Sequence, residues 1–320
     1  MKIYKRAGLQ NITGKRIFHT ILFLFATTSS PSQPCSPIVS PSFSEAVQKE
    51  YYQNLQLAKA EYEKDTANAD ALTWYGRRLA YTGDYMGAIA VFTSGIKLHP
   101  DDARLYRHRG HRYITVRCFD LAIDDFIKAA ELTEGEPDET EPDGLPNAKN
   151  IPTSTLQSNI WYHLGLAFFL KKEYKKAEKA YRQGLEASKN DDMYVAMANW
   201  LHITLLAQGR EREAGQLYST VPAFPDLIEN EDYLRLLQIY YKEKPASPVA
   251  VDLYIQSLPG NKAALSSATL YFGIGFYCHL KGMKEKAGEM FQKAIATGQW
   301  ASFGYIAAEK MLGERSGFEF

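Results

Sequence analysis

The residues with the clearest chemical potential lie in the stretch Arg104–Arg112, which carries four arginines and two histidines within nine residues. A guanidinium group presents a planar fork of N–H donors that matches a carboxylate or a phosphate in two-point contact. Several such side chains on one helix face would form a local anion site. The stretch therefore makes an acidic group on a partner the first binding hypothesis.

A structural role for the same arginines stays open, because acids surround them in the sequence. Their guanidinium groups could form ion pairs that fix the stacking of neighbouring helices, with the aliphatic stems packed beneath. The acidic segment Glu134–Asp143 could also neutralise the cluster from within the chain. The flanking aspartates are Asp101, Asp102, Asp120, Asp124 and Asp125.

A metal or catalytic centre is not predicted. His108 and His111 stand three residues apart, and Cys118 and His163 could lie near them, but zinc needs three or four converging ligands. The sequence has no HExxH motif, no GxSxG motif, no P-loop and no dinucleotide-binding glycine motif after a strand. We therefore predict no catalytic residues, no metal and no cofactor. The three cysteines are too few and too scattered to predict a disulfide framework.

Composition and charge limit the class of partner. The 320 residues include 37 Lys and Arg against 37 Asp and Glu, so the formal net charge is zero. A general basic field for nucleic acid or membrane is absent, so nucleic acid is not expected as a partner. An electrostatic partner would have to be recognised by a local patch.

The N-terminus resembles an export signal. Basic residues up to Arg16 precede the apolar run Ile17–Phe25, and small residues follow it at Ala26–Ser30. This three-part pattern predicts a secretory signal peptide at residues 1–30, with the mature protein exported to a periplasm or secreted. The apolar run is too short to span a bilayer, so no transmembrane span is expected after its removal. A lipid anchor at Cys35 is the alternative, although the residues before Cys35 match a lipidation motif poorly.

A repeat is visible in the spacing of small and aromatic residues. Gly76 and Gly110 stand 34 residues apart, and within a unit Gly precedes Ala by 12 residues and Ala precedes an aromatic residue by four. Such spacing is typical of paired antiparallel helices, in which Gly and Ala allow close approach and the aromatic ring fills the gap one turn on. The four units use Gly76, Ala88 and Phe92; Gly110, Ala122 and Phe126; Gly165, Ala177 and Tyr181; and Gly275, Ala287 and Phe291. A weaker unit has His202, Ala214 and Tyr218.

These residues resemble the tetratricopeptide repeat family, most closely at Trp161, Leu164, Gly165, Phe168, Ala177 and Tyr181. The resemblance implies an all-α, right-handed α-solenoid of about five to six helix hairpins. It also implies that the first helix of each hairpin lines a concave groove. The positions facing that groove would be Arg77, Arg104, Arg107, His108, His111, Asn159, Tyr162 and His163. The carboxylate clamp of chaperone-binding members is not reproduced, since Thr73 and His108 stand where basic or Asn residues would be expected.

The remaining segments complete the predicted architecture. A Pro/Ser-rich linker at 31–42 leads to a helical solenoid over 43–320, which begins with a long helix at about 43–66. Residues 229–242 and 248–258 read as a degenerate helix pair, and 301–312 as a capping helix. The segment 133–156 interrupts the period with six acids and four prolines, which exclude a helix. It is either a solvated linker or a segment that folds back over the groove.

Two functions are therefore consistent with the sequence. In the first, the protein is a non-catalytic scaffold that binds a protein or an acidic peptide in a groove with an Arg/His-rich wall. In the second, it is a structural subunit whose Arg/His cluster only stabilises the stacking of repeats, with its contacts elsewhere, for example at Tyr233, Tyr240 and Tyr241. The segments 107–112 and 159–165 look like those of uncharacterised bacterial tetratricopeptide proteins, which implies a bacterial origin but no ligand. Oligomeric state is not predicted.

Overall fold

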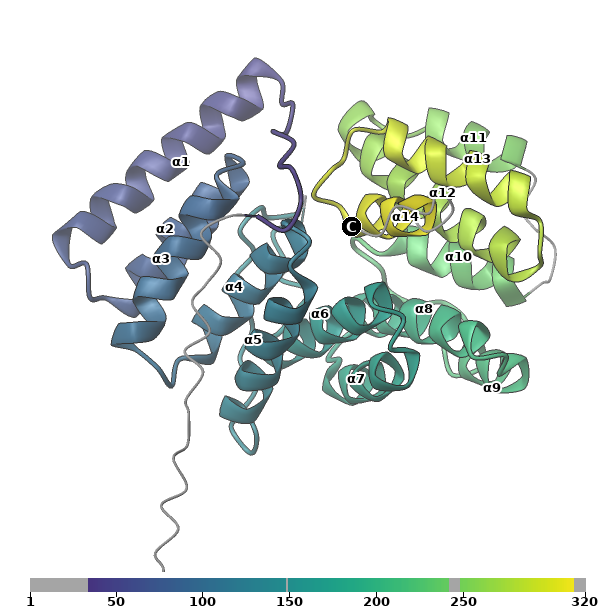
Figure 1. Ribbon diagram of the computed structural model, residues 1–320, viewed down its shortest axis with the longest axis horizontal. Helices are drawn as coiled ribbons and strands as arrows, with labels where there is room; N and C mark the ends of the chain where they lie inside the picture. Colours follow the sequence, from purple (N-terminus) through teal and green to yellow (C-terminus); the bar gives the residue numbers. More distant parts are fainter. Residues whose placement is uncertain (1–33, 148, 242–247, 314–320) are drawn as a thin grey trace, which may run out of the picture. The chain divides into compact units, whose positions relative to one another are not determined.

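The computed structural model describes residues 34–147, 149–241 and 248–313, and in these ranges it contains fourteen α-helices and no β-strand. The predicted signal peptide at 1–30 lies outside the described residues. Consecutive helices pair as antiparallel hairpins that lie side by side along the chain (Figure 1). The paired helices are α2 (Ala69–Tyr81) with α3 (Tyr85–Leu98), α4 (Ala103–Thr115) with α5 (Phe119–Leu132), α6 (Leu156–Leu170) with α7 (Tyr174–Ala187), α8 (Asp191–Ala207) with α9 (Glu211–Tyr218), and α12 (Gly260–Leu280) with α13 (Lys284–Ala296). The predicted all-α solenoid is confirmed.

Close packing inside each hairpin follows the glycine and aromatic positions of the repeat. A Cβ atom on Gly76 would lie 2.5 Å from the ring of Phe92, and one on Gly165 would lie 2.5 Å from the ring of Tyr181. The equivalent distances are 3.0 Å from Gly110 to Phe126 and 2.7 Å from Gly275 to Phe291. The four alanines of the pattern, Ala88, Ala122, Ala177 and Ala287, are buried to 1% exposure or less. The spacing found in the sequence therefore records the contact between the two helices of a hairpin.

The weaker unit replaces the packing glycine by a histidine with its own partner. His202 Nδ1 donates a hydrogen bond to the carbonyl of Ala214 at 2.9 Å, across the α8–α9 hairpin. Burial lowers the pKa of His202 to about 4, so the ring is neutral at physiological pH. The second helix of this unit has only eight residues.

The accessory helices also match the predicted positions. Helix α1 (Glu45–Lys64) packs along α2 as the N-terminal helix. Helix α10 (Glu231–Tyr241) packs against α8 and α12, and α11 (Pro248–Gln256) packs against α12. Helix α14 (Phe303–Gly313) covers α12 and α13 as a C-terminal cap. Among the described residues, no helix combines the length and apolar character that a membrane span requires.

The turns between paired helices share a left-handed residue, which is glycine in three turns and Arg117 or Lys172 in the other two. Gly83, Gly209 and Gly282 supply the positive φ angle in three hairpins, but the α4–α5 turn uses Arg117 at φ 65°. A side chain in this conformation costs on the order of 1 kcal/mol. The cost is offset by the contacts of the Arg117 guanidinium group, which bind the C-terminal segment.

The C-terminal segment contacts the second hairpin as well as the last. Arg117 Nε lies 2.8 Å from Glu309 Oε2, Nη2 donates to the Trp300 carbonyl at 3.1 Å, and the guanidinium group stacks 3.9 Å above the Trp300 ring. The Trp300 ring also packs against Tyr85 with a centroid distance of 5.7 Å. The cap therefore fastens to a hairpin nearly 200 residues earlier in the chain.

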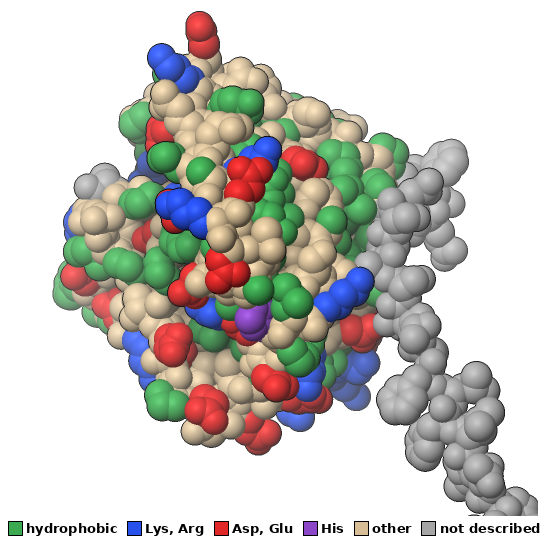
Figure 2. All heavy atoms as spheres, turned by 90° about the vertical axis from the view of Figure 1, so that its left-hand side faces the viewer, with side chains coloured by type: hydrophobic (Ala, Val, Ile, Leu, Met, Phe, Trp, Pro, Cys, Tyr) green, Lys and Arg blue, Asp and Glu red, His purple; other side chains and the backbone are tan. Residues whose placement is uncertain are grey.

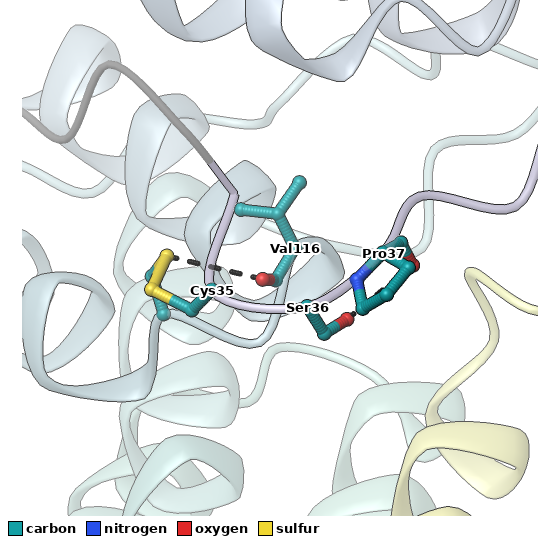
Figure 3. The surroundings of a disulfide bond; sticks show 5 residues. Cys35, Ser36, Pro37 and Val116 are labelled. Carbon is teal, nitrogen blue, oxygen red and sulfur yellow. Dashed lines mark hydrogen bonds between the residues drawn. A yellow bond between two sulfur atoms is a disulfide. The ribbon is translucent and has the colours of Figure 1, made fainter.

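The Pro/Ser-rich segment before α1 is bonded to the folded helices, through a disulfide that we did not predict. Cys35 forms a disulfide with Cys118 in the α4–α5 turn (Figure 3). The Cys35 N–H donates a hydrogen bond to the Val116 carbonyl at 3.2 Å. Residues 34–42 are therefore tied to the folded helices, whereas we expected a flexible linker. The scattered cysteines did not predict this pair, because their 83-residue separation carries no local signal. The third cysteine, Cys278, is buried and free.

Charged side chains of both signs are intermixed on the face shown in Figure 2, and no single-sign field covers it. This surface agrees with the equal numbers of basic and acidic residues in the sequence.

Candidate functional site

A cavity of about 500 Å³, called the main cavity below, lies on the inner side of the hairpins. The inner helices α2, α4, α6, α8, α10 and α12 contribute to its walls. Two further segments close over it: Glu141–Leu145 of the acidic insertion and Ala301–Gly304 before and at the start of α14. The insertion therefore folds back over part of the groove, which is one of the two alternatives that the sequence left open.

Most of the predicted groove residues do meet in this region. Arg77, Arg107, His111, Asn159, Tyr162 and His163 line the main cavity, and His108 lines a smaller chamber beside it. Arg104 is a correction. It lines neither space and instead forms ion pairs with Asp102 at 2.7 Å and Asp70 at 2.6 Å. Position 104 is therefore a stacking contact between the first and second hairpins.

Glu141 from the insertion is at the centre of the Arg/His wall. One of its carboxylate oxygens, Oε2, lies 3.0 Å from Arg107 Nε and accepts a hydrogen bond from Asn159 Nδ2 at 3.0 Å. The other, Oε1, lies 3.7 Å from His108 Nε2. Arg107 Nη1 donates to His108 Nδ1 at 3.0 Å, which places the proton of the neutral ring on Nε2, facing Glu141. Three groups from α4 and α6 therefore converge on one carboxylate.

The backbone of the insertion also binds to α2. Arg77 Nη2 donates to the Pro142 carbonyl at 2.7 Å, and Arg78 Nη1 donates to the Gly144 carbonyl at 2.8 Å. The Tyr81 hydroxyl lies against the Cα of Gly144 so closely that a Cβ there would overlap it. Residues 141–144 thus lie across the wall as a bound segment, with one side chain and two carbonyl groups recognised.

The histidines of the wall are stacked among aromatic rings. His108 stacks on Phe92 at 5.7 Å, and His163 stacks on Phe126 at 5.6 Å and contacts His111 at 4.4 Å. Burial lowers the pKa of all three histidines well below the usual value, and neighbouring arginines add to the decrease. They are therefore neutral polar groups at pH 7.

An aromatic network forms the next part of the wall. The Tyr162 hydroxyl lies 2.9 Å from the Tyr233 hydroxyl and accepts a hydrogen bond from Trp200 Nε1 at 2.9 Å. Tyr240 is buried and donates to the Gly273 carbonyl at 2.8 Å, whereas Tyr241 is 52% exposed. The three tyrosines that we considered as an alternative surface therefore lie in three different environments.

The described residues include no group of three or more His, Cys, Asp or Glu side chains placed to hold a metal ion. Cys118, which we considered beside the histidines, is bonded to Cys35.

Comparison with known proteins identifies the repeat. The tetratricopeptide repeat family model matches residues 158–191, which form α6, α7 and the start of α8. The hairpins α2–α3, α4–α5 and α12–α13 repeat the same glycine–aromatic contact. This chain therefore contains a tetratricopeptide repeat. A search of curated proteins finds no match to the sequence.

Several solved structures are similar in fold to this chain. A tetratricopeptide repeat protein from Parabacteroides merdae has a TM-score of 0.49 at 18% identity, over 83% of this chain and 98% of its own. YrrB, described as having an unusual peptide-binding site, has a TM-score of 0.42 at 17% identity, over 80% of this chain and 99% of its own. MamA from AMB-1 has a TM-score of 0.41 at 18% identity, over 55% of this chain and 91% of its own.

The charge of the cavity differs from our expectation for a tetratricopeptide groove with a basic wall. Arg77 and Arg107 are its only guanidinium groups, whereas four carboxyl groups line it, from Glu141, Asp143, Glu229 and Asp232. Burial raises the pKa of Asp143 and Glu229. The cavity as a whole is therefore not electropositive. Its positive end is confined to α2 and α4, and sequence reasoning missed the acids because Glu229 and Asp232 come from a distant segment.

Arg112 is a functional candidate that the groove assignment omitted. It lines the smaller chamber together with Arg77, Arg107, His108 and Glu141. Burial lowers the pKa of Arg112 to about 10, and the positive charges of Arg107 and Arg77 add to the decrease. The sequence signal that could have identified Arg112 is its position in the Arg/His-rich stretch, five residues after Arg107.

Proposed function

We propose that the protein is a non-catalytic scaffold that binds a segment of another protein in the cavity, with a carboxylate of that segment held by the wall of α2, α4 and α6. The observation that supports this most directly is the position of Glu141. The chain's own insertion offers a carboxylate to Arg107, His108 and Asn159 in the geometry that an acidic peptide would use.

The recognition extends beyond one charge. Arg77 and Arg78 bind the carbonyl groups of Pro142 and Gly144, so the wall selects an extended backbone beside the acidic side chain. Extended segments commonly bind in this way, with backbone hydrogen bonds giving affinity and one or two side-chain pockets giving specificity. An incoming acidic segment would replace residues 141–144 contact for contact.

The protein's own insertion supplies the probe for a direct test. A fluorescent peptide with the sequence of residues 138–145 is titrated into the full chain and into E141Q, and binding is followed by anisotropy. The wild-type wall is occupied, so the peptide binds weakly. In E141Q the internal carboxylate is gone, and we expect binding at least about tenfold tighter, which corresponds to about 1.4 kcal/mol. E134Q changes an exposed glutamate of the same insertion and should behave as wild type.

A second substitution makes the test decisive. Adding R107Q to E141Q should abolish the gain, because the incoming carboxylate then lacks its guanidinium partner. If E141Q binds the peptide no better than E134Q, or if R107Q leaves the gain intact, the proposed site is wrong.

A structural role for part of the cluster is the second candidate. Arg109 forms a two-point contact with Asp125, at 2.8 Å from Nε to Oδ2 and 2.7 Å from Nη2 to Oδ1, and Arg104 pairs with Asp70 and Asp102. These contacts favour the structural-subunit hypothesis for two of the four arginines. Under that hypothesis R107Q would lower stability without affecting any captured partner.

We also propose that the protein is exported. The disulfide between Cys35 and Cys118 supports this, since disulfides persist mainly in oxidising compartments. The same bond argues against the lipid-anchor alternative, because one sulfur atom cannot carry both a thioether and a disulfide. Mass spectrometry of the secreted chain without reductant tests export and the disulfide. The mass of the processed N-terminus shows whether the leader is cleaved, and the mass of the segment 34–118 shows whether the bond is present.

A further inference from the structure

The smaller chamber holds more positive charge than the described residues neutralise. It has a volume of about 100 Å³ and lies between α2, α3 and α4, with Arg77, Arg107 and Arg112 among its lining residues. Glu141 is the one carboxylate in that lining. The adjoining histidines His108 and His111 are neutral, because burial lowers the pKa of both well below the usual value. Two of the three guanidinium groups therefore have no carboxylate within this lining, and Asp143, which lines the adjoining cavity, interacts with Arg77 from outside it.

The three guanidinium groups differ in their partners. Arg107 has the carboxylate of Glu141, and Arg77 has the carbonyl of Pro142. Among the described residues, Arg112 is half-buried and forms no ion pair with a carboxylate, and the Nε of Arg107 is buried without a hydrogen-bond acceptor. Like charges held together away from water repel strongly unless a counter-charge is bound.

The chamber also contains groups that suit an anion in other ways. The side chains of Tyr81 and Tyr85 lie close enough to Arg112 to affect its charge, and Tyr81 lines the chamber itself. A water molecule occupies about 30 Å³ of liquid, so the chamber has room for about three waters or one small tetrahedral ion. The ring of Phe92 and the methyl group of Ala80 form its apolar side.

We propose that this chamber is a binding site for a small oxyanion of charge near minus two, of the inorganic phosphate or sulfate class. The guanidinium groups of Arg112 and Arg77 supply the donors, and the ion balances the charge that Glu141 leaves over. The site adjoins the peptide site in the main cavity and shares Arg77, Arg107 and Glu141 with it. It requires no partner protein, so it stands if the peptide proposal fails.

The test is calorimetric titration of the full chain with inorganic phosphate at pH 7.5, in a chloride buffer of constant ionic strength, with thermal unfolding as the second readout. We expect one saturable site, and a melting temperature that rises with phosphate in the wild type, because a ligand that binds only the folded state stabilises it. In R112Q we expect at least about a tenfold loss of phosphate affinity.

A second feature of R112Q separates the ion site from a merely structural role. Because R112Q removes an uncompensated charge, its melting temperature in chloride should equal or exceed that of the wild type. In phosphate the wild type should have the higher melting temperature, because only the wild type binds the ion well. R104Q, whose arginine pairs outside the chamber, should keep the full phosphate response. R77Q and R112K provide folded alternatives if R112Q does not accumulate. A wild-type chain that responds to phosphate no more than to chloride, or an R112Q chain that responds as the wild type does, would overturn the proposal.

Discussion

The two faces of helix α4 carry arginines in opposite situations. On the outer face, Arg104 and Arg109 each have aspartate partners on their own or neighbouring hairpins, at sequence separations of 2, 16 and 34 residues. On the inner face, Arg107 and Arg112 line one chamber with Arg77, and the carboxylate in that lining, Glu141, comes from the insertion and pairs with Arg107. The outer arginines therefore complete the stack of repeats, whereas the inner ones depend on a segment outside the repeat.

This difference shows how one helix can serve both stacking and binding. A pair between adjacent repeats is fixed by the fold and offers nothing to a partner. An ion pair with a loop residue can be replaced by one with a partner, because the loop can move away while the hairpins stay folded. The following variants test whether the two faces are as separate as the contacts indicate.

The largest effect is expected from Asp125→Ala on the outer face. Asp125 is 4% exposed and holds Arg109 in a two-point contact, so its removal leaves a largely buried guanidinium group without its carboxylate. We expect a loss of about 3 kcal/mol or more in the free energy of unfolding, measured by urea denaturation. Phosphate and peptide binding by the folded fraction should be unchanged. Equal stability of D125A and wild type would contradict the stacking role.

Acidification should act mainly on the inner face. His108, His111 and His163 have pKa values lowered in the folded state, so the unfolded chain binds more protons below its histidine pKa of about 6.5. Stability is therefore full above that pH and falls as the pH decreases, by up to about 1.4 kcal/mol per pH unit for each histidine. Urea midpoints between pH 7.5 and 5.5 measure the slope. H111Q should reduce the slope of stability against pH by the contribution of one histidine. An unchanged slope would show that His111 does not contribute.

Glu141→Gln should give an intermediate loss of stability. It removes the carboxylate shared by Arg107, His108 and Asn159, which leaves a buried arginine without its counter-charge. We expect a decrease of about 1–3 kcal/mol, against about zero for E134Q in the same insertion. Added phosphate should recover part of the loss in E141Q. The proposed difference between the two faces is contradicted if E141Q loses as much free energy of unfolding as D125A and phosphate restores none of it.

The smallest effect is expected from Arg104→Gln. The Arg104 side chain is 38% exposed, and its partner Asp70 is 72% exposed, so solvent screens most of this pair. Exposed ion pairs contribute about 1 kcal/mol or less. A shift in the urea midpoint well beyond that range would show that the first and second hairpins rely on this contact more than its exposure suggests.

The hairpins could be predicted because their determinants are local. Gly76 and Phe92 lie on helices joined by one short turn, and the spacing that brings them together is repeated through the chain. The groove positions on α2, α4 and α6 were implied by the resemblance to the tetratricopeptide repeat family. Arg104 was misplaced because Asp70, one repeat earlier, holds its side chain away from the groove.

The features that cover the cavity could not be predicted in this way. Arg117 meets Trp300 and Glu309 across separations of 183 and 192 residues, and no period in the sequence links them. The acidic insertion was recognised as a segment able to fold back, but composition does not say which of its six acids enters the wall. The acids at the far end of the cavity were missed for the same reason, since Asp232 belongs to a degenerate helix pair.

The disulfide described above also has a mechanical consequence. It joins two points 83 residues apart, and the closed covalent loop contains α1, α2, α3 and α4. A chain pulled from its two ends would transmit force through the sulfur atoms and leave these helices outside the load path. About 280 Å of contour length, at about 3.4 Å per residue, would stay hidden until the bond is reduced. The N-terminal repeats are in this sense shielded from tension that the later repeats must bear.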